Sequence, residues 1–426
     1  MTRTRNHRRR RGAGPAAILG LALLLADASD APAVSVAAAA AASDDYEIGV
    51  ENFLYRSQST LLNRDNVFGL DPTENLFRLT ATGRSTFGRF AVKASAFLEQ
   101  QTGRTDKTKV TFRQAFVDYR TDEGFLLRVG KQKTAWGSGF AWNPTARLEP
   151  PKSPANPGAE QPGIDAVRID VSPSDWGSLT LVAGRAEAGL TDLPGSLARE
   201  TEPSWTAAVR ARLLVRDTDI ALTYLAGTRR PGLWGLDLGR TWGSVALHAE
   251  SALYRASEID QARPDDSFLR VAAGALWSPG NSSLSLEYFW NGEGMTGSQY
   301  NAYTGRLDRN LATARDQRLP EAARNLAFAA WSVDAAIPFA ENLGLRRHYA
   351  SISFTRKDIA TDLNANLRAV SGLSDRGLIV TPGLAYAPTG NVQMSLDIVL
   401  LFGPETAEYK LAPIRRAFQA RLKYSF

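Results

Sequence analysis

The chain has 426 residues, with 50 Lys and Arg, 44 Asp and Glu, and no Cys. The lack of Cys excludes disulfide bonds and thiolate metal sites. Residues 1–42 hold six of the Arg and two of the Asp, so the rest is nearly neutral and nucleic-acid binding loses its main support. No stretch approaches about 18 consecutive apolar residues, which excludes a transmembrane helix.

Residues 1–42 have the pattern of a signal peptide. Six arginines between positions 3 and 11 precede an apolar stretch, 16–26, that is too short to span a bilayer as a helix. Small residues follow up to Ala42, so we expect cleavage after Ala28 or Ala42. The alternative is a disordered basic tail that binds nucleic acid or lipid. We expect residues 43–426 to form a single domain.

From residue 46 onward, segments of about ten residues alternate in polarity, the period of a strand with two different faces. Their length suits a tilted membrane strand. We predict eighteen strands: 46–56, 74–83, 88–100, 108–120, 125–133, 164–172, 176–186, 204–216, 219–227, 232–239, 243–254, 267–278, 282–291, 347–355, 360–370, 377–386, 391–402 and 415–426.

The connections alternate in length. Those after even-numbered strands are tight and most contain Gly, Pro, Asn or Asp: 85–88, 121–124, 173–175, 216–218, 240–242, 279–281, 356–358 and 388–390. Those after odd-numbered strands are longer, up to 134–163 and 292–346. This alternation predicts an all-β fold, a transmembrane antiparallel up-and-down β-barrel of about eighteen strands, with sixteen as the alternative. Short turns and both chain ends would be periplasmic, and the long loops external.

Alternation also separates two faces. Apolar positions would face lipid, because an Arg or Lys there costs about 2–4 kcal/mol near the midplane. Charged positions would then line the pore: Lys93, Glu99, Arg128, Arg168, Asp170, Arg210, Arg212, Glu250, Arg270, Glu287, Asp397 and Arg421. The excess of positive charge favours anions; the alternative for each residue is a solvated lumen face. In 108–120, Arg113 and Gln114 compete for the inward position.

Two stretches carry a resemblance to a known family. The chain ends with apolar residues at alternate positions, from Phe418 to Tyr424 and Phe426. This end resembles the closing strand of bacterial outer-membrane β-barrels, and we expect Tyr424 and Phe426 to act as the assembly signal. Gly130-Lys131-Gln132, then Trp136-Gly137, then Asn143-Pro144, resembles a pattern of porin-like outer-membrane proteins. The resemblance implies a porin-type channel in a Gram-negative-type outer membrane and names no solute.

The two longest loops are candidates for narrowing the pore. We expect Trp136, Trp142 and Asn143 to belong to a constriction loop, since aromatic and Pro residues favour an ordered loop. In the second loop, Pro320 fits a helix start, and we predict a helix over 320–333. Its Ala-rich face with Leu326, Phe328 and Trp331 would pack in or over the mouth, or the helix is an external decoration.

An enzymatic site has little support. Only His248 and His348 remain outside the leader, and both are expected to be structural. We predict no enzyme, metal or cofactor, and a channel for passive diffusion of small hydrophilic solutes. The alternatives are a specific porin or exporter for carbohydrate or acidic polymer, and a barrel enzyme or adhesin acting through external loops. Expected partners are outer-membrane lipid, small hydrophilic solutes and the barrel-assembly machinery, and we expect no nucleic acid. The sequence leaves the oligomeric state open, with a homotrimer as one alternative.

Overall fold

The computed structural model describes residues 43–102, 107–134, 136–149, 162–186, 204–228, 232–256, 266–337 and 344–426. The predicted signal peptide lies outside these ranges. Eighteen strands account for most of the described chain: β1 (Ser43–Ser57), β2 (Thr73–Phe87), β3 (Phe90–Thr102), β4 (Lys107–Arg120), β5 (Phe125–Gln132), β6 (Ile164–Ser174), β7 (Gly177–Ala186), β8 (Ser204–Val215), β9 (Thr218–Gly227), β10 (Leu233–Trp242), β11 (Val245–Tyr254), β12 (Phe268–Trp277), β13 (Ser282–Asn291), β14 (His348–Ala360), β15 (Leu363–Gly372), β16 (Gly377–Thr389), β17 (Val392–Phe402) and β18 (Ile414–Ser425).

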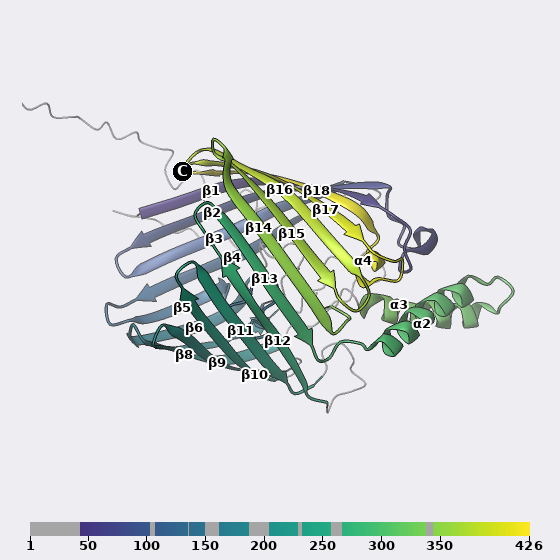
Figure 1. Cartoon of the computed structure of the whole chain (residues 1–426), viewed down its shortest axis with the longest axis horizontal. Helices are drawn as coiled ribbons and strands as arrows, with labels where there is room; N and C mark the ends of the chain where they lie inside the picture. The colour runs from purple at the N-terminus through teal and green to yellow at the C-terminus, as the bar shows by residue number, and fades with distance from the viewer. Residues whose placement is uncertain are drawn as a thin grey trace, which may run out of the picture.

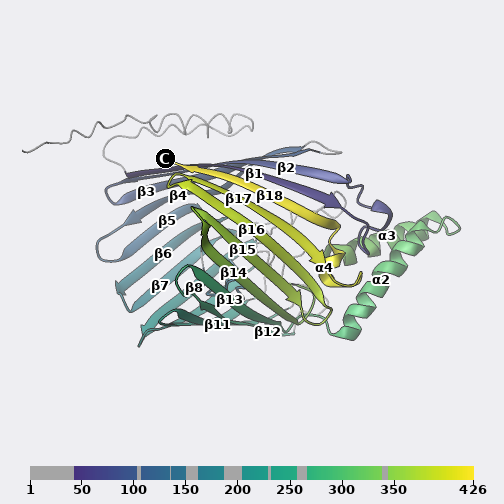
Figure 2. The same ribbon diagram turned by 45° about the horizontal axis from the view of Figure 1, so that its top comes forward.

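The strands form one closed antiparallel barrel (Figures 1 and 2). Each strand pairs with its neighbour in sequence, and β1 pairs with β18 to close the sheet. The register at the closure runs from Glu47 opposite Ser425 to Arg56 opposite Arg416. The Phe426 N–H donates to the Tyr46 carbonyl at 2.9 Å, so the two ends of the described chain lie together. The predicted eighteen-stranded up-and-down barrel is therefore confirmed.

Exposure follows the predicted alternation of faces. In β8, the side chains of Trp205, Val209 and Leu213 are exposed, whereas Thr206 and Ala208 are buried. The exposed set faces outward, where lipid replaces water as the neighbour of apolar side chains.

A β-bulge explains the ambiguous parity of the fourth strand. The register between β3 and β4 shifts after Ser95, which lies opposite Gln114, while Ala96 lies opposite Phe112. Arg113 is the extra residue, and both Arg113 and Gln114 are buried. A bulge places two residues of one strand opposite one residue of its partner, and the rest of the strand keeps its faces. Arg113 and Gln114 can therefore both point into the interior.

One predicted turn is wrong. β14 continues through 356–358 to Ala360, and the turn lies at Thr361 and Asp362. Asp358 has a φ of 53° and sits at a register irregularity between Arg356 and Ala360. An Asp in the left-handed region suits a bulge as well as a turn, so the local sequence does not separate the two.

Helices occupy the external connections. α2 (Gly297–Arg315) and α3 (Glu321–Ala336) form a helical hairpin between β13 and β14, while η1 (Arg64–Asn66) follows β1 and α4 (Glu408–Leu411) precedes β18. The hairpin lies beyond the strand ends, on the side where η1 and α4 are drawn (Figures 1 and 2). Among the described residues, no helix is long and apolar enough to cross a membrane.

The hairpin packs on the barrel rim through an apolar cluster. Trp331 of α3 is fully buried with Leu62 of the β1–β2 connection and Leu411 of α4. Leu326 of α3 is instead 73% exposed, so the prediction that it shares the packed face with Trp331 is wrong. Sequence reasoning predicted α3 and missed α2, although the Thr296–Gln299 capping box at the start of α2 was readable.

Candidate functional site

The connection after β5 enters the barrel. We call residues 136–149 the inserted segment; they form no strand or helix. Trp136, Trp142 and Leu148 are buried. Leu148 and Trp136 belong to the same apolar cluster as Ala208 and Leu225, which are buried on β8 and β9. The segment therefore crosses the interior from β5 and packs against distant strands of the wall.

Two carboxylates on the wall accept the backbone N–H groups of the inserted segment. Glu250 of β11 accepts from Ser138 at 3.0 Å, Gly139 at 3.3 Å and Thr145 at 2.7 Å. His248 and Ala252 lie two residues before and after Glu250 on the same face of β11, and both are buried. Leu247 and Leu253 lie on the other face and are exposed outward.

Glu287 of β13 holds the adjoining part of the segment. It accepts from Phe140 at 2.6 Å, Ala141 at 3.1 Å and Trp142 at 2.8 Å. A buried N–H without an acceptor is costly, and ionised acceptors form the stronger hydrogen bonds. The two carboxylates thus satisfy a backbone that has no strand or helix of its own.

Side-chain contacts add to this backbone docking. The Trp142 ring stacks on Phe289 with 5.3 Å between centroids and lies 5.9 Å from the Tyr349 ring. The Tyr254 hydroxyl donates to the Pro144 carbonyl at 2.6 Å, and Thr145 Oγ1 donates to Asp237 at 2.8 Å. These contacts come from β10, β11, β13 and β14, so the segment is held along one half of the wall.

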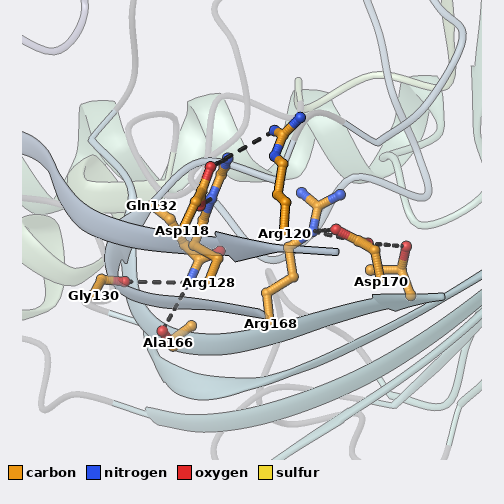
Figure 3. A network of polar contacts seen from close by, with 9 residues as sticks. Asp118, Arg120, Arg128, Gly130, Gln132, Ala166, Arg168 and Asp170 are labelled. Atoms are coloured by element: carbon orange, nitrogen blue, oxygen red, sulfur yellow. Dashed lines mark hydrogen bonds and ion pairs between the residues drawn. The ribbon is translucent and has the colours of Figure 1, made fainter. Parts of the chain in front are cut away.

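Glycines explain part of the sequence pattern around this segment. Gly130 of β5 has a φ of 122°, and a Cβ there would lie 2.2 Å from the Ala115 carbonyl oxygen. At Gly139 a Cβ would lie 1.9 Å from the Trp142 carbonyl oxygen. Gln132 is fully buried and donates to the Ala166 carbonyl at 2.7 Å, tying β5 to β6 where the segment begins (Figure 3).

The opposite part of the wall carries arginine–carboxylate pairs (Figure 3). Arg128 of β5 forms a bidentate pair with Asp118 of β4, with N–O distances of 2.6 and 2.9 Å. Arg168 pairs with Asp170 at 2.8 Å on β6. The Arg128 guanidinium also lies 3.9 Å from the centre of the Phe116 ring. Asp118 was not predicted as a site residue, because the parity of its strand was ambiguous.

A third group of pairs lies near the barrel closure. Arg78 of β2 bonds to Glu99 at 2.5 Å and to Glu51 at 3.3 Å. Arg421 of β18 lies 3.6 Å from Glu51 and 3.8 Å from Asp397. Charged groups of opposite sign therefore alternate around the inner wall.

Residues 77–145 match the model of a family described as phosphate-selective porin O and P. Several solved structures share the fold. OccAB3 of Acinetobacter baumannii is 10% identical with a TM-score of 0.54, over 90% of this chain and 99% of that chain. The outer membrane protein OprD of Pseudomonas aeruginosa is 9% identical with a TM-score of 0.51, over 90% and 93%. OpdK of P. aeruginosa, solved with vanillate, is 12% identical with a TM-score of 0.51, over 90% and 98%. No curated protein matches by sequence.

The chain is a porin-like β-barrel of the bacterial outer membrane. The family match ends at residue 145, so it includes Gly130, Trp136 and Asn143, on which the predicted resemblance rests. The predicted resemblance to porin-like outer-membrane proteins and the predicted outer-membrane location are confirmed.

Several of the predicted pore-lining residues of this porin-like barrel contact protein rather than open lumen. Glu250 and Glu287 face inward and are covered by the inserted segment. Arg270 is fully buried, bonded to Glu293 and stacked 4.1 Å from the Tyr254 ring centre. The pattern of alternation gives the inward direction of these side chains and cannot distinguish water from a folded-in loop as their neighbour.

The remaining predicted lumen residues differ in surroundings. Arg212 of β8 is half exposed and pairs with Asp219 beside the turn at 216–217, at the periplasmic end of the porin-like barrel. Arg210 lies further into the barrel, 2.9 Å from Asp237 and 5.8 Å from the Trp136 ring centre. Lys93 is half-buried on β3. Their role as pore-lining residues stays a prediction.

Both histidines have structural partners. His248 Nε2 lies 2.9 Å from Glu287, and its ring meets Phe140 edge-on at 4.7 Å. His348 Nδ1 lies 2.7 Å from the Tyr288 hydroxyl on exposed positions of β13 and β14. Neither contact includes a Ser or Cys nucleophile, which a hydrolytic site needs beside its base.

Proposed function

We propose that this porin-like barrel is a channel for small hydrophilic solutes, that it prefers anions, and that the inserted segment narrows it. The observation that carries the proposal is the order of exposure within the arginine–carboxylate pairs. Arg128 is 15% exposed while Asp118 is 1% exposed, and Arg210 is 15% exposed while Asp237 is 5% exposed. Arg168 and Asp170 follow the same order, at 21% and 12%.

This order decides which charge a solute meets. Each pair is close to neutral as a whole, yet its guanidinium lies on the accessible side and its carboxylate behind it. Guanidinium groups offer several N–H donors in a fixed plane that suits carboxylate and phosphate oxygens. Rings of such groups favour anions in a pore.

The comparisons support the same class of solute. The matching family model is described as phosphate-selective, and OpdK was solved with vanillate, a carboxylate. Phosphate and carboxylate share the oxygen geometry that an arginine binds. We therefore propose small anions as preferred solutes and expect no catalysis.

The proposal is tested by single-channel recording of the refolded mature protein under a salt gradient. Arg128→Gln and Arg210→Gln together keep a hydrogen-bond donor for each buried carboxylate while removing the positive charge. We expect the reversal potential to move toward cation preference, with the fold unchanged. Arg356→Gln is the matched control and should leave the reversal potential unchanged. Arg356 is an exposed arginine of β14 that bonds to Ser282 of β13. A reversal potential that is equally anionic in the double variant would contradict the proposal.

Assembly is a separate proposal. Tyr424 and Phe426 are exposed and meet edge-on at 4.7 Å at the end of β18, which suits a signal read from outside the barrel. Phe426→Ala should lower the yield of assembled barrel in cells and leave the conductance of refolded protein unchanged. The homotrimer stays a prediction, and sedimentation of the protein in detergent is the measurement that tests it.

A further inference from the structure

An arginine cluster lies on the outer face of the barrel, at the external end of the closure between β1 and β18. Arg56 of β1 is directly opposite Arg416 of β18. Leu54 is opposite Phe418 in the same register, and Leu54 is exposed on the lipid-facing side. Because side chains two positions apart share a face, Arg56 and Arg416 point outward like Leu54 and Phe418. The Arg416 guanidinium lies 5.7 Å from the Phe418 ring centre, which fits this direction.

A β-bulge adds a third arginine to the cluster. Arg56 is opposite Arg416 and the next residue, Ser57, is opposite Ile414, so Arg415 is the extra residue of β18. Bulges redirect side chains at strand ends. Arg415 and Arg56 line one pocket of about 410 Å³ together with Gln58, Ser59, Asn63 and Asn66.

The cluster has no countercharge among the described residues. Arg56, Arg415 and Arg416 are exposed, and no described carboxylate forms an ion pair with any of them. Like charges directly opposite each other on paired strands destabilise the pair. In this barrel other arginines have acidic partners, as Arg128 and Arg421 do. Three exposed arginines gathered at one place without an acidic partner suit an anion supplied from outside the chain.

The surface below the cluster determines which anion fits. Moving two residues along each strand toward the membrane reaches Leu54 and Phe418, and the neighbouring strand presents Leu400 opposite Arg416. Two residues of strand span roughly 7 Å. A ligand that satisfies both surfaces is therefore an amphiphile with a phosphate at the arginines and acyl chains on the apolar wall.

We propose that Arg56, Arg415 and Arg416 bind a phosphate group of a phosphorylated glycolipid in the outer leaflet. The pocket beside the arginines is lined by amide and hydroxyl side chains together with Leu70 and Pro72. The amide and hydroxyl groups suit the hydroxyl groups of a sugar headgroup. This site faces away from the lumen, so it is independent of the proposed solute preference. Bound lipid would strengthen the barrel where its first and last strands meet.

The test is native mass spectrometry of the refolded mature chain with diphosphorylated lipid A in mixed micelles. Arg56→Ser with Arg416→Ser should reduce retained lipid about ten-fold or more, since each basic residue near an anionic headgroup adds to binding. Arg309→Ser with Arg318→Ser removes two exposed arginines from the external hairpin and is the matched control, expected to retain lipid as the wild type does. Heat-modifiable gel mobility and unchanged conductance verify that the variants fold. If the double variant does not fold, lipid retention is measured on the single variants Arg56→Ser and Arg416→Ser instead.

Two further measurements distinguish a lipid phosphate from free inorganic phosphate as the bound group. Dephosphorylated lipid A should be retained about ten-fold less by the wild type, and excess inorganic phosphate should not displace the diphosphorylated lipid. Equal retention by the wild type and the Arg56/Arg416 pair would overturn the proposal. Displacement by inorganic phosphate would also overturn it, because the site would then be one for a free anion.

Discussion

The inserted segment and the helical hairpin are two long connections of one barrel, and they differ in where their backbone hydrogen bonds go. The inserted segment has no helix or strand, and six of its N–H groups donate to Glu250 and Glu287 on the wall. The hairpin residues bond within α2 and α3. The hairpin meets the rim through apolar contact around Trp331 and through side-chain bonds, such as those from Tyr300 to the Thr406 carbonyl and from Arg315 to Asp65.

The difference shows what places a loop inside or outside a barrel. An irregular segment can be buried against the inner wall only if the wall supplies acceptors, since each unpaired buried group costs about 1–3 kcal/mol. A helix satisfies most of its own backbone and can stay at the rim, where its exposed face meets water. The buried carboxylates of β11 and β13 are therefore the residues that decide the position of the inserted segment.

Removing both carboxylates should have the largest effect. Glu250→Ala with Glu287→Ala leaves six N–H groups without acceptors, and the bonds of three of them are fully buried. Each buried group without a partner costs about 1–3 kcal/mol, so we expect the inserted segment to leave its site. Single-channel recording should then show a several-fold larger conductance with greater current noise. Asp122→Ala, at an exposed periplasmic turn, is the control. Wild-type conductance and noise in the double variant would show that the segment does not narrow the channel.

Releasing the hairpin should have a local effect. Trp331→Ala truncates a fully buried side chain, a change that costs about 3–5 kcal/mol, and the loss falls on contacts with Leu62 and Leu411. We expect faster proteolysis within α2 and α3, with the strands still resistant and conductance unchanged. Leu326→Ala, on the exposed face of α3, should leave proteolysis unaltered. Loss of conductance in Trp331→Ala would mean that the hairpin also shapes the channel.

The smallest effect is expected where the two regions approach each other. Glu408 of α4 is half-buried. It accepts from the Tyr349 hydroxyl at 2.6 Å and from the Leu345 N–H at 2.8 Å, and Tyr349 contacts Trp142. Burial raises the pKa of Glu408 to about 7. The folded rim therefore favours the protonated form of Glu408. The contribution of Glu408 to the stability of the rim is largest below the ordinary carboxyl pKa and is lost as pH rises through about 7.

Hydrogen exchange measures this pH dependence. Amides of residues 405–412 should be protected roughly ten-fold or more better at acidic than at alkaline pH, after correction for intrinsic exchange rates. Glu408→Gln should remove the difference. Protection that increases with pH in the wild type would contradict the assignment.

Most of the barrel could be predicted because its signals are local. Strand faces follow a period of two. In the turn at Arg216 and Asp217 both residues have positive φ, and Asp is one of the residues that tolerate that conformation. The bulge at Arg113 could not be predicted, since it depends on the register against Ser95 and Ala96. The bulge at Asp358 was mistaken for a turn for the same reason.

The site was predictable in part. Alternation gave the inward direction of Glu250 and Glu287, and the aromatic residues of 134–163 indicated an ordered loop. Which groups these carboxylates bind depends on the path of a segment more than a hundred residues earlier in the chain. Asp237 and Thr145 carry no distinguishing local pattern, so their contact emerges only from the folded barrel.

The central claim is that the inserted segment is a fixed part of the channel wall. A Cβ added at Gly235 would lie 3.1 Å from Thr145 Cβ. A disulfide needs about 3.5–4.5 Å between the two Cβ atoms, so the two backbones have to separate by a few tenths of an ångström. Because the chain has no Cys, Thr145→Cys with Gly235→Cys introduces a single defined crosslink. The decisive measurement is its single-channel conductance before and after reduction. We predict the same conductance and ion preference in both states; a channel that conducts only after reduction would contradict the claim, because the segment would then have to leave the wall for solutes to pass.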